Sequence, residues 1–196
     1  MKFILAFLLL GLACPRAYGR TSVPEFAEIC GIRVGYDTTD TLEHQMGHGS
    51  PEMGGHAHSG RRWLSTPAGC EIDTDAFYYY DYNGPEDGPV IDFISITPIS
   101  PRAADRALTG ENKLPEARVA PEKTRFMGVV SLGMTKDEVL RALGTRLPPP
   151  TVEKGAFVWN ADGYVHIRQQ DILSTSWRAQ LTFQHGKLYE IRIEGD

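Results

Sequence analysis

The sequence lacks the short motifs that mark common enzyme classes. Ser50 lies in the segment from Gly47 to Pro51, and this segment lacks the nucleophile-elbow glycine. No phosphate-binding glycine loop precedes a helix that carries a lysine. We therefore expect a protein that is not an enzyme, with an unrecognised hydrolase as the alternative.

Basic residues are also scarce relative to acidic ones. The chain has 20 Lys and Arg against 25 Asp and Glu, which gives a net charge of −5. A chain with this balance gains no electrostatic attraction to nucleic acid or to anionic membrane surfaces. We expect neither as a partner.

Long hydrophobic runs are confined to the first residues. Lys2 is followed by an unbroken apolar run from Phe3 to Ala13, and small residues lead to Gly19. This pattern is typical of a signal peptide over residues 1–19 and is too short for a membrane span. The sequence thus predicts an exported protein, periplasmic or secreted, with no transmembrane segment in the mature chain.

Cysteines are few, and the three present have different expected fates. Cys14 ends the apolar run in a context that resembles a bacterial lipobox, which makes it a candidate for a lipid anchor. Cys30 and Cys70 remain after cleavage, and in an oxidising compartment they are expected to form one disulfide. That bond would close a loop of about forty residues and stabilise the fold by about 3 to 4 kcal/mol. The alternative is two free, partly buried thiols.

The clearest local pattern is a capped helix between Phe126 and Gly144. Thr135 and Glu138 form a capping box, and Gly144 is a typical helix stop. The periodicity places three apolar residues on the buried face of this helix, namely Val139, Leu140 and Leu143.

A fainter copy of the same pattern lies at residues 26–47. Gly35 stands 98 positions before Gly133, and Asp37 matches Thr135 as the expected helix cap. The repeat continues to the far end of each half, where Gly88 to Ile96 lies 98 positions before Gly186 to Glu194, each a turn glycine feeding a β-branched strand. Trp63 and Trp159 are 96 positions apart, near the middle of each copy. Such self-similarity predicts a duplicated architecture.

The predicted fold class is α+β, with two related halves that each pack short helices on an antiparallel β-sheet. The expected divisions are a signal peptide at 1–19, a first repeat at 20–97, a proline-bearing linker at 98–121 and a second repeat at 122–196. Strands are predicted near residues 62–65, 70–73, 76–82 and 90–97, and near 157–160, 164–169, 177–183 and 188–193, with a turn at 161–163. The length allows two small domains or one continuous body.

The second half carries a family resemblance. The sequence pattern of this half resembles the tandem-repeat beta-lactamase inhibitory proteins. The pattern runs from Phe126 through Gly133-Met134-Thr135 to Gly144 and continues at residues 181–188. It is also similar to the small outer-membrane lipoproteins of the barrel assembly machinery. The resemblance implies helices packed on an antiparallel sheet that binds other proteins. It does not extend to a particular partner, since sites are grafted onto folds.

Residues 44–58 form a tract rich in histidine and methionine. Imidazole and thioether donors together suit copper, and imidazole alone suits zinc. The candidate metal ligands are His44, His48, His56 and His58. Gly47 is expected to end the helix between His44 and His48, so the alternative is a solvated glycine-rich loop.

Aromatic residues gather in the first half. A strand through residues 77–82 would place three tyrosines on one face, and tyrosine supplies large contact area at low entropic cost. The candidate protein-binding residues are Tyr78, Tyr80, Tyr82 and Trp63. The alternative is an amphipathic strand whose tyrosines only cover the sheet.

These patterns together predict an exported, non-enzymatic module that binds another protein. The alternative is an envelope protein that binds copper or zinc through residues 44–58.

Overall fold

The computed structural model describes residues 23–52, 59–77, 89–110, 113–167 and 171–195. Its architecture is α+β, which confirms the predicted fold class. The first half contains η1 (Glu25–Ala27), β1 (Glu28–Ile29), β2 (Ile32–Arg33), α1 (Thr39–Met46), β3 (Ser50–Glu52), β4 (Gly60–Ser65), β5 (Cys70–Phe77) and β6 (Val90–Pro98). After α2 (Pro101–Thr109), the chain continues through η2 (Pro121–Thr124), α3 (Lys136–Leu143), β7 (Thr151–Glu153), β8 (Ala156–Ile167), β9 (Asp171–Gln184) and β10 (Lys187–Gly195).

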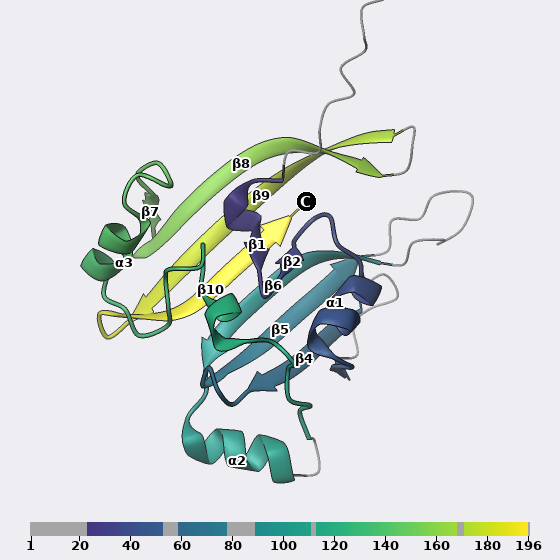
Figure 1. The fold of residues 1–196 in the computed structure, drawn as a ribbon. Helices are drawn as coiled ribbons and strands as arrows, with labels where there is room; N and C mark the ends of the chain where they lie inside the picture. The colour runs from purple at the N-terminus through teal and green to yellow at the C-terminus, as the bar shows by residue number, and fades with distance from the viewer. Residues whose placement is uncertain (1–22, 53–58, 78–88, 111–112, 168–170, 196) are drawn as a thin grey trace, which may run out of the picture.

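One antiparallel sheet runs through both halves. Its strand order is β3-β4-β5-β6-β10-β9-β8-β7, so each half contributes four strands in the same order from the edge inwards. The halves meet where β6 pairs with β10, with Ile96 opposite Ile191 and Ile94 opposite Ile193. Figure 1 shows this continuous sheet, with α1 and the β1–β2 hairpin in front of it.

The two halves make similar backbone connections before their main helices. In the first half, Gly35 N–H donates to Ile91 O (2.6 Å) and Ile91 N–H donates to Asp37 O (2.9 Å). In the second half, Gly133 N–H donates to Leu188 O (2.8 Å) and Leu188 N–H donates to Met134 O (2.6 Å). The segment that enters each helix is therefore fixed to the last strand of its own half.

Helix α3 starts and stops as its sequence predicts. Thr135 Oγ1 accepts from Glu138 N–H (3.3 Å), and Glu138 Oε2 accepts from Thr135 N–H (2.7 Å). Gly144 follows the helix at φ +54°. Val139 and Leu143 are buried as expected, but Leu140 is 42% exposed, so its predicted burial is wrong. The helix is only eight residues long, and its buried stripe is narrower than the sequence suggested.

The cap of α1 differs from the prediction. Thr38, and not Asp37, is the residue that precedes the helix, and its side chain makes no capping bond. Asp37 instead accepts from Arg33 N–H (2.8 Å) and pairs with the Arg33 guanidinium (2.7 Å). Arg33, four residues earlier in β2, thus binds the Asp37 carboxylate, which could otherwise have capped the helix. Gly47 ends α1 as expected.

Strands β8 and β9 are longer than their sequence signals indicated. The predicted turn at residues 161–163 is wrong, because Ala161, Asp162 and Gly163 lie within β8 and pair with Trp177, Ser176 and Thr175. Pairing along the whole length of β9 outweighs the local turn preference of these residues.

The predicted linker is partly structured. It contains α2, and its residue Glu116 forms a β-bridge with Leu64 of β4.

The core lies on one face of the sheet, and three tryptophans connect it to the backbone. Trp63 Nε1 donates to Gly47 O (3.0 Å) and Trp159 Nε1 donates to Pro148 O (2.8 Å), so each half anchors the chain just after its helix. Trp177 of β9 is buried and donates to Val34 O (2.7 Å) in the other half. Element η1 likewise packs against β9 and β10. Within the described ranges, no helix has the length and apolar character needed to cross a membrane.

Candidate functional site

The face of the sheet opposite the core carries polar side chains, most of which are partly exposed, although Ser95 is buried. In β5 the burial alternates at every residue, with Ile72, Thr74 and Ala76 turned towards the core. Paired residues of an antiparallel sheet share a face, and the register therefore brings the intervening residues of β4, β5, β6, β10 and β9 together. We call this surface the polar face, and it includes Arg62, Glu71, Asp73, Asp75, Phe93, Ser95, Arg192, Glu194, Gln180 and Arg178.

The centre of the polar face lies where the two halves join. Phe93 of β6 is opposite Glu194 of β10, and the Arg192 guanidinium lies over the Phe93 ring, 4.7 Å from its centroid. Arg192 Nε also donates to Glu194 Oε1 (2.7 Å). A ring, a cation and a carboxylate are thus held in fixed positions at the seam, although they come from opposite halves.

The flanks of the polar face differ in charge. On the first half, Arg62 pairs with Glu71, while Asp73 and Asp75 follow along β5. On the second half, Arg178 contacts Glu153 Oε2 at 2.6 Å, and Gln180 Nε2 donates to Thr182 Oγ1 (3.2 Å). These contacts order long side chains in advance, which lowers the entropy that a partner must remove on binding.

The predicted protein-binding residues are only partly placed by the structure. Tyr78, Tyr80 and Tyr82 lie outside the described residues, which reach Phe77 at the end of β5. Trp63, the fourth candidate protein-binding residue, is fully buried in this structure and is not part of its surface. The indole is large and apolar, and its one donor is satisfied by Gly47 O, so the core is where it is most stable.

Two of the four predicted metal ligands are described, and they lie near the end of α1. His44 is exposed on the last turn of the helix, and Gly47 separates it from His48. His56 and His58 lie outside the described residues. Among the parts of the chain that the structure covers, no group of three His, Cys, Asp or Glu residues is arranged to hold a metal ion.

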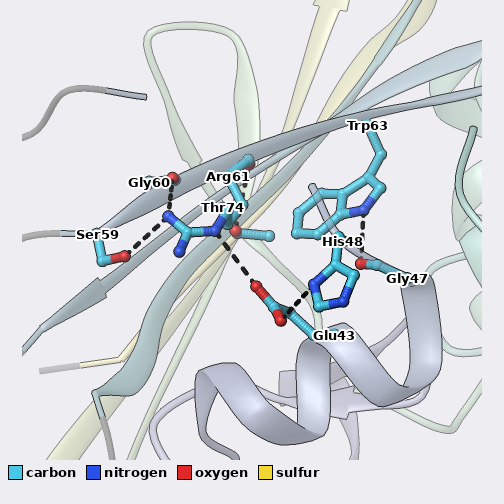
Figure 2. Close-up of polar contacts among 8 residues, drawn as sticks. All are labelled: Glu43, Gly47, His48, Ser59, Gly60, Arg61, Trp63 and Thr74. Atoms are coloured by element: carbon cyan, nitrogen blue, oxygen red, sulfur yellow. Dashed lines mark hydrogen bonds and ion pairs between the residues drawn. The ribbon is translucent and has the colours of Figure 1, made fainter. Parts of the chain in front are cut away.

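His48 is instead held by a carboxylate. Its Nδ1 lies 2.7 Å from Glu43 Oε2, while the other oxygen of Glu43 lies 3.6 Å from Arg61 Nε. Figure 2 shows Glu43 between the imidazole and the guanidinium, with Trp63 behind them. Arg61 also donates to Ser59 Oγ and Gly60 O, both at 3.0 Å. Glu43 therefore connects α1 to the start of β4.

Cys30 and Cys70 are both buried and are free thiols, so the predicted disulfide is not formed in this structure. Burial raises the pKa of the Cys30 thiol far above its usual range and raises the pKa of Cys70 to about 12. Each thiolate would lose its hydration in the core, and the neutral thiol is therefore favoured. The structure corresponds to the alternative of two buried thiols.

No protein-family model, curated protein or solved structure matches this chain. The site must therefore be interpreted from its own residues. Sequence reasoning missed Phe93 and Arg192, although both lie in strands that were predicted correctly. The signal that could have found them is the period of two within each strand, but the pairing of β6 with β10 had to be known before they could be placed together.

Proposed function

We propose that this protein is an exported, non-enzymatic module that binds another protein through the polar face of its sheet. The observation that carries the proposal is the junction of β6 and β10, which turns two small sheets into one surface that spans both halves. A surface of this kind suits a partner protein, since specific interfaces bury about 800 Å² on each side.

The composition of the polar face supports the same conclusion. Interfaces combine a small number of well-placed aromatic and arginine side chains with a polar surround. Phe93 and Arg192 occupy the centre of the face, and ion pairs such as Arg62–Glu71 and Arg178–Glu153 lie at its flanks. The predicted tyrosines at 78, 80 and 82 follow β5 in the sequence and are further candidate anchors.

The resemblance to beta-lactamase inhibitory proteins and to small outer-membrane assembly lipoproteins belongs to this proposal. What supports it is the repeat of a short helix followed by four antiparallel strands in each half. Export through the signal peptide, and anchoring through Cys14, are likewise proposed from the sequence.

Affinity capture from an envelope extract tests the proposal. The mature protein is expected to retain a partner that the double variant Phe93→Ala/Arg192→Ala loses, because truncation of central anchors removes most of the binding energy. Arg141→Ala, on the exposed side of α3, is the matched control and should capture the partner normally. A triple change of Tyr78, Tyr80 and Tyr82 to Ala tests the tyrosines separately. Equal capture by all variants would argue against this face.

A second candidate function is copper or zinc binding by residues 44–58. The Glu43–His48 contact favours it, because metal-ligating histidines commonly donate their second ring nitrogen to a carboxylate. Titration with copper and zinc should show binding tighter than about millimolar, and His48→Ala should weaken it, whereas His185→Ala on the β9–β10 turn should not. Absence of binding to the wild-type protein would end this candidate.

A further inference from the structure

The outer edge of β8 is longer than the strand that covers it. Strand β7 pairs Thr151, Val152 and Glu153 with Val158, Phe157 and Ala156. From Trp159 to Ile167, β8 is paired with β9 on its other side, but the described ranges contain no strand paired to its outer side. In Figure 1 the β8–β9 hairpin extends past the rest of the sheet.

The turn between β7 and β8 determines which backbone groups point outwards. Lys154 and Gly155 both have positive φ, +46° and +84°, so they form a two-residue turn that closes on the pair Glu153 and Ala156. The backbone of Ala156 therefore faces β7, and every second residue after it faces the same way. Beyond β7, the N–H and C=O groups of Asn160 and Asp162 point away from β9.

The opposite end of the sheet is protected, whereas no comparable feature among the described residues blocks this edge beyond β7. Strand β3 is three residues long and carries Pro51, and short strands and prolines are common ways to block edge pairing. Strand β8 has no proline between Ala156 and Ile167. Beyond Ala161, which pairs with Trp177, the β8–β9 hairpin has no third strand beside it among the described residues, because β10 pairs with β9 only as far as Trp177. A two-stranded ribbon of this kind is marginally stable in water.

We propose that this edge pairs with β8 of a second copy of the chain. The pairing is antiparallel about a two-fold axis, which is the commonest symmetry of homo-oligomers. The same kind of pairing already joins the two halves of one chain, since β6 and β10 are equivalent strands of the repeat and pair in antiparallel register. Pairing of two copies would satisfy the outward groups of Asn160 and Asp162 and extend one sheet through the dimer.

Sedimentation equilibrium of the full protein tests this proposal. The wild-type protein should have twice the mass of one chain, and Asp162→Pro should raise the dimer dissociation constant by about tenfold or more, because proline removes an outward N–H and fits the edge poorly. The β8–β9 ladder does not use the Asp162 N–H, so far-UV circular dichroism should be unchanged. A monomeric wild-type protein at the highest soluble concentration would overturn the proposal.

A control variant and a second design separate dimerisation from misfolding. In β7 the N–H of Val152 also points away from β8, and its side chain is 61% exposed, so Val152→Pro is a matched edge proline outside the paired region and should remain dimeric. The double variant Asn160→Lys/Asp162→Lys places like charges near the axis without altering the backbone. It should dissociate, and the dimer should return at high salt. Retention of the dimer by both interface variants would contradict pairing through β8.

Discussion

At the scale of single residues, equivalent positions of the two halves have diverged in their surroundings. Gly35 and Gly133 both adopt positive φ before their helices, at +76° and +84°. A Cβ on Gly35 would lie 2.8 Å from Trp177 Nε1, whereas a Cβ on Gly133 would meet nothing within 4 Å. Gly133 can therefore serve as the control position when the effect of packing against Trp177 is measured at Gly35.

Gly35→Ala is expected to destabilise the protein more than Gly133→Ala. Both changes place alanine in a left-handed conformation, which costs about 1 to 2 kcal/mol. The change at Gly35 must also displace Trp177, whose indole donates to Val34 O, and loss of that buried bond adds about 1 to 3 kcal/mol. The free energy of unfolding in urea measures the difference. Equal losses in the two variants would show that Trp177 moves at no cost.

At the scale of elements, the two main helices have the same length but different starts. Thr135 and Glu138 form a reciprocal cap at α3, whereas the side chain of Thr38 makes no capping bond at α1. Asp37, which the sequence suggested as the cap, is held by Arg33, and this hydrogen bond is the largest contribution to the raised pKa of Arg33. Helix α1 consequently depends more on the contacts of Leu42 and Met46 with the core.

Removal of the cap should therefore affect only one helix. Thr135→Ala is expected to cost about 1 kcal/mol of stability, as is typical for loss of an N-cap. Thr38→Ala, at the residue that precedes α1, should cost no more than a few tenths of a kcal/mol, because no capping bond is lost. Chemical denaturation of the two variants, compared with the wild type, checks this. A larger loss for Thr38→Ala would mean that the hydroxyl of Thr38 has a role outside the helix start.

The same cap predicts a pH dependence. The backbone N–H of Thr135 donates to Glu138 and lowers the pKa of that carboxyl below its usual value. A lowered folded-state pKa gives stability that is present above the unfolded pKa, near 4.5, and is lost as the pH falls through the folded value. Unfolding measured between pH 7 and pH 3 should show a smaller acid-induced loss in Glu138→Gln. Identical pH profiles for the wild type and this variant would contradict the assignment.

At the scale of the whole molecule, the β6–β10 seam makes the two halves one cooperative unit. Ile94, Ile96, Ile191 and Ile193 are all buried there. The first half also reaches across the seam, because η1 packs on β9 and β10 and Trp177 is bonded to Val34. Each half therefore lacks part of its core without the other.

Ile193→Ala is expected to lower the stability of both halves together. Truncation of a buried isoleucine costs about 2 to 5 kcal/mol, and a single transition should persist because neither half retains a complete core. Tryptophan fluorescence and far-UV circular dichroism should report the same midpoint. Two separate transitions would show that the halves unfold independently.

Sequence reasoning captured the repeat, α3 and most strands because these depend on local signals such as capping, turns and apolar periodicity. It did not capture the features that depend on partners distant in sequence. The local sequence of residues 161–163 predicts a turn, but their pairing with β9 makes them part of a strand. On sequence alone Trp63 is a candidate binding residue, but its indole is in the core and donates to Gly47 O. The Phe93–Arg192 contact required the pairing of strands from opposite halves, which no local pattern encodes.

The position of the seam also bears on how the chain folds. Most neighbours in the sheet are joined by short connections, but β6 ends at Pro98 and its partner β10 begins only at Lys187. Contacts between segments so distant in sequence form late and slowly. During synthesis, the edge of β6 that pairs with β10 therefore stays unpaired until the second half has been made. This interval is when the nascent protein most needs a chaperone to prevent aggregation.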